Sequence, residues 1–187
     1  VIGLYGSAEL DYKNFLTLTV TGRNDWSSTL PKDNNNYFYP SVGAAFVFTD
    51  AFNLESNWLS FGKLRASWAQ VGNDTNPYQT SGAFVSQTTF NGQPTFSNQD
   101  FIPNANLKPE LTTSYEIGAD IRFFRDRLNF DFTYYNATTK DQIISLPIAI
   151  SSGYNQQVIN GGKVNTKGIE IILGGTPIKT ANFKWNT

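Results

Sequence analysis

The sequence contains no cysteine, no histidine and no methionine among its 187 residues. Without cysteine the chain has no disulfides and no thiolate nucleophile, and most structural zinc sites are excluded. Without histidine it lacks the commonest general base near neutral pH. We therefore expect no enzyme activity, and no catalytic, metal-binding or cofactor-binding residues.

Charge and long apolar runs are scarce as well. Charged residues make up 16% of the chain and the net charge is −1, which predicts no general affinity for nucleic acid or acidic membranes. No run approaches about 18 consecutive apolar residues, so the sequence predicts no transmembrane helix. Aromatic residues nevertheless reach 15%, although the mean hydropathy is −0.33. This combination is typical of strands that have one polar face and one face in lipid.

The chain does contain a repeated alternation of polar and apolar residues. In the segment 112–123, for example, Ile117, Ala119 and Ile121 share one row, and Glu116 and Asp120 share the other. Side chains alternate faces with period two in a strand, so each row is one surface of a sheet. About eight strands are predicted, over residues 2–11, 15–23, 37–49, 59–71, 112–123, 128–136, 166–174 and from 183 onward.

The connections between these strands alternate between short and long. The long ones are 24–36, 72–111 and 138–165, and 72–111 is expected to be irregular. The short link 50–58 has room for one helical turn. Short periplasmic turns and long extracellular loops are typical of antiparallel transmembrane β-barrels. We expect residues 1–187 to form one partial barrel domain of a longer polypeptide, because the strand pattern already runs at both ends.

Five runs of sequence are characteristic in their order: LRASWAQVGN (64–73), NLKPELTTSYEIG (106–118), NFDFTYYNATTKD (129–141), NTKGIE (165–170) and NFKW (182–185). Together they resemble the SusC/RagA-like TonB-dependent outer-membrane transporters. The resemblance implies a barrel of about 22 strands, of which eight are roughly a third. It also implies a plug domain, absent here, through which TonB acts.

The same resemblance implies a role and partners. The protein would sit in the outer-membrane lipid of a Bacteroidota-type bacterium and import glycans, oligosaccharides or peptides, with a SusD-like surface lipoprotein as partner. Two alternatives remain open. One is a self-contained eight-stranded outer-membrane barrel that acts as an adhesin or structural anchor. The other is a soluble carbohydrate-binding sandwich, whose strands would usually have about five or six residues.

Seven charged residues fall in the polar rows and are expected to face the barrel lumen: Lys63, Arg65, Glu116, Asp120, Arg122, Asp131 and Glu170. They form either a polar track for substrate or plug, or cross-strand ion pairs along the wall; the second interpretation is favoured. Lys63 and Arg65 would then face Glu116 and Asp120, at about 0.2–1 kcal/mol per pair. Glu116 and Asp120 lie about 13 Å apart along one strand, too far for a glycosidase pair.

The long loops carry aromatic residues that are candidates for contact with sugar rings or with the partner lipoprotein: Trp26, Tyr78, Phe84, Phe90 and Phe101. The alternative is that they pack among themselves within the loops. Two oxygen-rich runs, 33–36 and 73–75, do not have the spacing of an EF-hand and are interpreted as turns.

Overall fold

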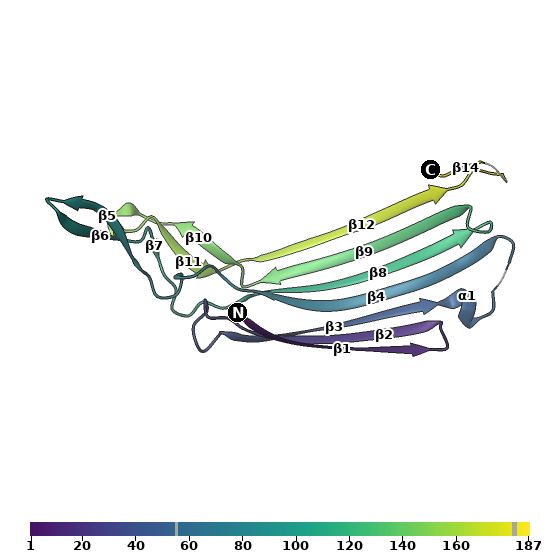
Figure 1. Cartoon of the computed structure of the whole chain (residues 1–187), viewed down its shortest axis with the longest axis horizontal. Helices are drawn as coiled ribbons and strands as arrows, with labels where there is room; N and C mark the ends of the chain where they lie inside the picture. The colour runs from purple at the N-terminus through teal and green to yellow at the C-terminus, as the bar shows by residue number, and fades with distance from the viewer. Residues whose placement is uncertain (55, 181–182) are drawn as a thin grey trace.

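A computed structural model describes residues 1–54, 56–180 and 183–187. Seven long strands form one antiparallel sheet in the order β1-β2-β3-β4-β8-β9-β12 (Figure 1). Their bounds are β1 Ile2–Tyr12, β2 Leu16–Trp26, β3 Asn36–Val47, β4 Leu59–Asn73, β8 Glu110–Phe123, β9 Leu128–Lys140 and β12 Lys163–Gly175. Each strand of the sheet therefore lies beside the long strand that precedes it in the sequence, and a turn or a longer connection links the two. This is the arrangement of an up-and-down barrel wall.

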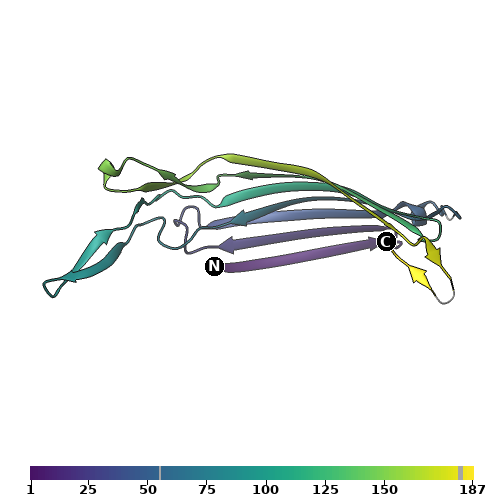
Figure 2. The same cartoon turned by 90° about the horizontal axis from the view of Figure 1, so that it is seen from above.

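The sheet is curved and open. Its edges are β1 and β12, which do not pair with each other (Figures 1 and 2). The predicted all-β antiparallel class is confirmed, and the barrel is not closed within the described residues.

Short and long connections lie at opposite ends of the sheet, as the sequence predicts. The short-turn end also carries α1 (Phe48–Ala51), and the other end carries the shorter strands of the long connections (Figure 1). Helix α1 begins two residues before the link 50–58 in which a helical turn is expected. Residue 55 of that link is outside the described residues.

The longest connection is more regular than expected. It contains β5 (Phe84–Phe90) and β6 (Gln93–Asn98), which form an antiparallel hairpin that projects beyond the sheet (Figure 2). A shorter strand, β7 (Phe101–Ile102), pairs in parallel with β11 (Gln156–Asn160) of the last long connection. That connection also contains β10 (Ile143–Pro147), which pairs with β11, and a 3₁₀ turn, η1 (Ile150–Ser152).

Most long strands also extend further into the long loops than the hydrophobic pattern predicts. Strand β9 continues to Lys140 instead of residue 136, and β2 continues to Trp26 instead of residue 23. The added residues are rich in Asn, Asp, Thr and Lys. The backbone ladder does not depend on side-chain polarity, so pairing continues where the apolar row has ended.

The predicted eighth strand, from residue 183 onward, contains β14 (Lys184–Trp185), which pairs with β13 (Ile178–Lys179) in a separate hairpin. After β14 the chain returns to the sheet, because Thr187 and Gly175 of β12 exchange two backbone hydrogen bonds of 2.8 Å. The main sheet of the described residues thus has seven strands, not eight. Residues 181 and 182, part of the turn expected there, lie outside the described residues.

One face of the sheet is apolar and uncovered. A cross-strand row on this face consists of Phe46, Leu64, Ala119, Phe132 and Ile171. Leu64 is 48% exposed and Ile171 is 62% exposed, because no second layer packs on them within the described residues. The seven strands have 11 to 15 residues, whereas those of a soluble sandwich usually have about five or six, so that alternative is wrong. Among the described residues, no helix has the length and apolar character needed to cross a membrane.

Candidate functional site

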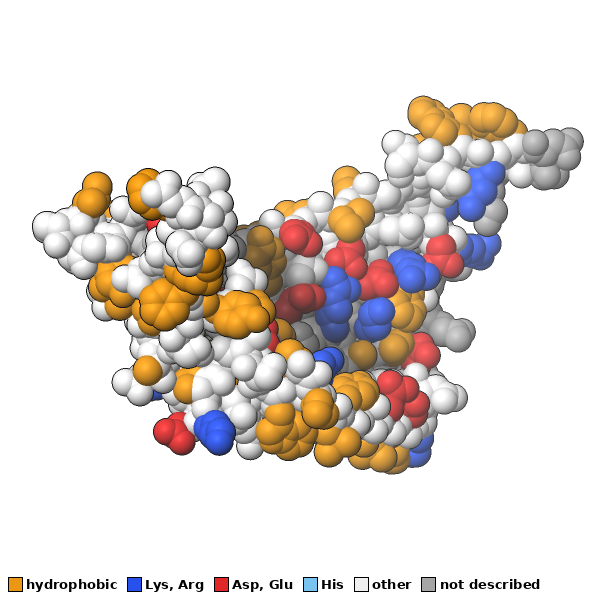
Figure 3. Space-filling model, turned by 60° about the vertical axis from the view of Figure 1, so that its left-hand side comes forward, with side chains coloured by type: hydrophobic (Ala, Val, Ile, Leu, Met, Phe, Trp, Pro, Cys, Tyr) orange, Lys and Arg blue, Asp and Glu red, His pale blue; other side chains and the backbone are white. Residues whose placement is uncertain are grey.

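The opposite face of the sheet carries all seven of the charged residues predicted for the polar rows. They come from four neighbouring strands, β4, β8, β9 and β12, and gather in the hollow of the sheet (Figure 3). We call this set the charged wall: Lys63, Arg65, Glu116, Asp120, Arg122, Asp131 and Glu170. Its members come from sequence positions more than a hundred residues apart, and strand register alone brings them together.

Arg65 is the centre of the charged wall. Its Nη1 donates to Asp131 Oδ2 at 2.9 Å and its Nη2 to Asp131 Oδ1 at 2.7 Å. Nη2 also donates to Thr133 Oγ1 at 2.5 Å. Asp131 and Thr133 lie on β9, two strands away from β4, so the side chain spans the whole width of β8. Arg65 thus binds the Asp131 carboxylate in a bidentate manner, which is among the strongest hydrogen-bonded arrangements of an arginine with a carboxylate.

The crossing depends on the glycine beneath it. Gly118 lies directly opposite Arg65 on β8. A Cβ atom at Gly118 would lie 2.5 Å from Arg65 Nε and 2.8 Å from Cζ, closer than non-bonded atoms approach. Any side chain at this position would therefore push the guanidinium away from Asp131.

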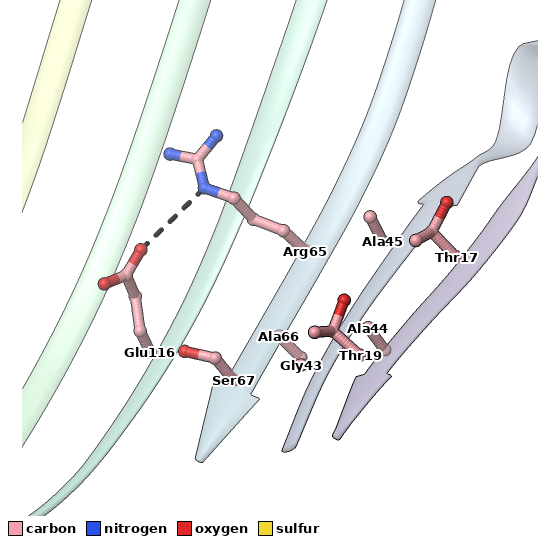
Figure 4. A pocket seen from close by; sticks show the side chains of 9 residues that line it. All are labelled: Thr17, Thr19, Gly43, Ala44, Ala45, Arg65, Ala66, Ser67 and Glu116. Carbon is pink, nitrogen blue, oxygen red and sulfur yellow. Dashed lines mark ion pairs between the residues drawn. The ribbon is translucent and has the colours of Figure 1, made fainter. Parts of the chain in front are cut away.

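Ion pairs between neighbouring strands complete the wall, as predicted. Lys63 Nζ lies 4.0 Å from Asp120 Oδ2. Arg65 Nε lies 3.8 Å from Glu116 Oε1, the ion pair drawn in Figure 4. Arg122, which lies on β8 like Asp120, has its Nη2 3.3 Å from the same Asp120 oxygen. The pair of Arg65 with Asp131 was missed, because sequence reasoning considers only adjacent strands. Glu170 makes no ion pair within the described part of the chain.

Two hollows lie on this face. A cavity of about 210 Å³ lies beside Arg65, where β3 contributes only small residues such as Gly43 and Ala45 (Figure 4). A wider one of about 570 Å³ is lined by residues that include Asp131, Tyr135 and Glu170. The charged wall is thus a recessed polar surface with room above it, rather than a packed core.

We expect Arg65→Ala to lower the free energy of unfolding of the whole protein by about 1–3 kcal/mol. Hydrogen bonds to charged groups are worth about 1.5–3 kcal/mol, and water screens part of this because both side chains are about 30% exposed. Arg122→Ala is the control, with an expected loss below about 1 kcal/mol. The measurement is urea unfolding in detergent micelles. Equal losses for the two variants would contradict the assignment of Arg65 as the centre.

The three long loops share the apolar core of the described chain. Leu30 from the first loop, Leu107 from the second and Val158 from the third are 5%, 0% and 1% exposed. Tyr37, Phe101 and Ile143 pack around them. We call this cluster the loop core. It joins segments that the sequence separates by up to 128 positions (158 − 30).

Hydrogen bonds fasten the same loops to each other. Asn160 Nδ2 donates to Lys108 O at 2.8 Å, and Lys108 N donates to Asn160 Oδ1 at 2.8 Å. Asn34 Nδ2 donates to Leu107 O at 3.2 Å. Since backbone groups of one loop are paired with side chains of another, the loops form one ordered unit.

The five aromatic candidates lie on β2 (Trp26), β5 (Phe84 and Phe90), β7 (Phe101) and the segment between β4 and β5 (Tyr78). Phe101 packs against the loop core and is only partly exposed, so for this residue the interpretation of packing within the loops applies. Tyr78, Phe84 and Phe90 are 69%, 77% and 71% exposed, and Trp26 at the end of β2 is 40% exposed. Phe84 and Phe90 belong to the projecting hairpin, which also exposes Phe96. Strands β5 and β6 were not recognised in the sequence because neither has a regular alternation of polar and apolar residues.

A polar cluster marks the loop end of β2 and β3, beyond the apolar row that ends at Val20. Arg23 Nε donates to Asp25 Oδ1 at 2.8 Å, and the hydroxyl of Tyr39 donates to the other carboxylate oxygen. The hydrogen bond from Arg23 holds the pKa of Asp25 below its ordinary value. Burial, with the nearby Asp25 carboxylate, raises the pKa of Tyr39 to about 12. The cluster therefore stays as a charged pair with a neutral tyrosine at neutral pH.

Comparison with known proteins agrees with this architecture. The family model described as TonB dependent receptor-like, beta-barrel matches residues 1–187. The chain belongs to this TonB-dependent receptor family. TonB-dependent receptor P26 of Formosa agariphila is 35% identical over 192 residues, which cover 100% of this chain and 19% of that protein. TonB-dependent receptor SusC of Bacteroides thetaiotaomicron is 27% identical, with 100% and 19% covered.

Solved structures show the same fold. The RagAB peptide importer in its closed-closed state superimposes with a TM-score of 0.88 at 24% identity, over 97% of this chain and 20% of the other. The chain thus spans about a fifth of the length of the proteins it matches.

Family membership fixes the setting of the sheet. TonB-dependent receptor β-barrels are outer-membrane proteins, so the seven strands are part of an outer-membrane barrel of the SusC-like type. The family consists of transport receptors rather than enzymes. Its named relatives come from Formosa and Bacteroides, consistent with the predicted Bacteroidota origin.

Proposed function

We propose that this chain forms part of the barrel wall of a TonB-dependent transporter that imports glycans, oligosaccharides or peptides together with a SusD-like surface lipoprotein. The observation that carries the proposal is the family match over the full chain, with SusC among the relatives. The RagAB structure, whose fold this chain shares, is described as a peptide importer. Residues 1–187 are a partial barrel domain in this proposal, and TonB would act through a plug outside it.

In this proposal the charged wall faces the lumen and the apolar row faces lipid. Support comes from the curvature of the sheet, since the charged residues occupy its hollow (Figure 3). The ion pairs around Arg65 hold the wall in register. Glu116, which makes one long contact, and Glu170 remain available to substrate or plug.

The long loops would be extracellular, because long connections of outer-membrane barrels lie on that side. The projecting hairpin presents Phe84, Phe90 and Phe96 to the surroundings, at 77%, 71% and 63% exposure. Exposed aromatic side chains of this kind are enriched in protein interfaces. We assign this hairpin, together with Tyr78 and Trp26, to contacts with substrate or with the lipoprotein.

The test is growth of the native bacterium on a panel of glycans and peptides as carbon sources. Deleting the gene should abolish growth on one class. Replacing Phe84, Phe90 and Phe96 by serine should slow that growth and reduce recovery of a co-purified lipoprotein, while the barrel remains folded. The control replaces Ser86, Thr89 and Ser97 of the same hairpin by alanine. If the gene deletion leaves growth unchanged on every source, the adhesin or anchor alternative gains support instead.

A further inference from the structure

The sequence contains two Asn–Gly dipeptides, Asn91–Gly92 and Asn160–Gly161, and the structure places them in opposite environments. In an Asn–Gly dipeptide the asparagine side chain can react with the backbone that follows it. Glycine has no Cβ, so its amide nitrogen approaches the side-chain carbonyl carbon of the asparagine without a clash. The two dipeptides therefore share their chemistry and differ in what the fold does to them.

Asn91 and Gly92 form the turn of the projecting hairpin (Figure 2). Phe90 pairs with Gln93 directly beside them, so the loop has two residues. The φ values of 47° at Asn91 and 76° at Gly92 are those of a type I′ turn. Both residues are exposed, and a Cβ atom at Gly92 would have no atom beyond its chain neighbours within 4 Å. Water therefore has free access to this dipeptide.

No hydrogen bond restrains the reacting groups of the first dipeptide. The two side-chain hydrogen bonds of the hairpin lie further along its strands, from Gln87 to Ser97 and from Thr95 to a backbone carbonyl. Within the described part of the chain, the side-chain amide of Asn91 and the backbone N–H of Gly92 make none. The amide can therefore turn toward the Gly92 nitrogen without breaking a contact.

The hairpin can also open locally at low cost. Strands β5 and β6 pair only with each other, in a two-stranded sheet, and their register shifts between Gln87 and Phe90. An isolated two-stranded hairpin is marginally stable in water. Mobile loops lie at the low end of the range of local opening free energies. Asn91 can therefore leave its turn conformation and bring its side-chain carbon to the Gly92 nitrogen.

The second dipeptide is held by the surrounding loops. Asn160 Nδ2 donates to the carbonyl oxygens of Lys108 at 2.8 Å and of Asp141 at 2.9 Å, and Asn160 Oδ1 accepts from Lys108 N at 2.8 Å. The nitrogen of Gly161, which would have to attack, donates to Gln142 O at 2.8 Å. Strand β11, which ends at this asparagine, contributes to the loop core. Every reacting group of this dipeptide is therefore engaged.

We propose that Asn91 deamidates spontaneously, whereas the fold protects Asn160. The Gly92 nitrogen loses its proton to base and attacks Asn91 Cγ. The new C–N bond closes a succinimide ring, and the side-chain nitrogen leaves as ammonia. Water then opens the ring at either carbonyl, which gives aspartate or isoaspartate. The net reaction consumes water and releases ammonia, mole for mole, and needs no oxidant and no enzyme.

The product adds a charge to a segment that has none. Residues 75–99 contain no Asp, Glu, Lys or Arg, so the new carboxylate would be the only charged side chain of the hairpin. It would follow Phe90, which is 71% exposed. Isoaspartate also lengthens the backbone by a carbon atom, which a two-residue type I′ turn cannot accommodate without a change of geometry. The surface altered is the one that the proposed function assigns to partner contacts, although the reaction does not depend on that function.

The experiment follows both asparagines in the same sample. The full-length protein in detergent is incubated in mildly alkaline buffer, and samples taken over time are digested at mildly acidic pH. Mass spectrometry of the peptides that carry Asn91 and Asn160 measures the fraction in which the amide has become a carboxyl group. We expect Asn91 to convert at least about tenfold faster than Asn160. Its products should elute as two peaks of equal mass, aspartate and isoaspartate, because both arise from the succinimide.

Two controls separate the effect of the fold from that of the local sequence. Unfolding the protein in urea removes the hydrogen bonds of Asn160, so both dipeptides should then convert at similar rates. Gly92→Ala places a Cβ beside the attacking nitrogen and should slow the conversion of Asn91. This variant is measured in urea, where the geometry of the turn has no influence.

Two results in the folded protein would overturn this assignment: conversion of Asn160 as fast as that of Asn91, or an unchanged Asn91 that does convert in urea. Failure of both dipeptides to convert in urea would also reject it, because the local chemistry would then be absent. The growth assay on carbon sources tests the transport function separately, and neither result decides the other.

Discussion

Leu107→Ala is expected to destabilise the loop core by about 2–5 kcal/mol, the usual cost of removing a buried leucine. Leu107 is 0% exposed and contacts a cluster to which all three long loops contribute. The loss should appear as local unfolding of the loops, because the seven-stranded sheet does not depend on this cluster. Hydrogen exchange of the β7 and β11 amides should accelerate at least about tenfold, since about 1.4 kcal/mol corresponds to a factor of ten.

Leu146→Ala provides the control for this effect. Leu146 lies on β10 in the same loop region but is 42% exposed, so its truncation leaves no cavity. Its effect on exchange should stay within about twofold. If both leucine variants accelerate exchange equally, the loops do not fold as one unit around Leu107.

Ile171→Arg should cost about 2–4 kcal/mol of barrel stability in a bilayer, the value for an arginine at the midplane of a lipid-facing strand. Ile171 is central in the apolar row of β12, between Ile169 and Leu173, and pairs with Phe132 on β9. Its side chain is 62% exposed and touches no second layer. The measurement is reversible urea unfolding of the full-length protein in liposomes. Ile117→Arg on β8 should behave similarly.

The adjacent residue provides an almost ideal comparison. Ile172 is 66% exposed, about as much as Ile171, but it belongs to the opposite row and lies directly opposite Asp131. An arginine there meets a polar, recessed face with a carboxylate close by, so Ile172→Arg should change stability by less than about 1 kcal/mol. A larger cost for Ile172→Arg than for Ile171→Arg would reverse the assignment of the two faces.

The long strands and their faces were predictable because the signal is local. Alternation in a segment such as 112–123 assigns each side chain to a face without knowledge of any partner strand. The same holds for the ion pairs of Lys63 with Asp120 and of Arg65 with Glu116, since adjacent antiparallel strands bring consecutive polar rows together.

Strand ends and loop structure were predicted less well. The apolar row of a strand ends before its backbone hydrogen bonds do, because the pairing does not require apolar side chains. For this reason β9 reaches Lys140, beyond the end predicted from its apolar row. The hairpin of β5 and β6 has no regular alternation to reveal it. The C-terminal residues form a local hairpin of β13 and β14 before Thr187 bonds to Gly175 of β12, and these short strands have no periodic pattern that predicts the hairpin.

The sequence by itself determined the antiparallel sheet, the polar and apolar faces, the alternation of short and long connections, and the family. Each follows from residues close together in the chain or from short motifs. The tertiary structure alone decided that Arg65 passes over Gly118 to reach Asp131, and that Leu30, Leu107 and Val158 form one loop core. The Arg65–Asp131 contact joins residues 66 positions apart (131 − 65), and the loop core joins residues up to 128 positions apart (158 − 30). Their proximity depends on the register of intervening strands and on three loops folding together, and no local pattern encodes either.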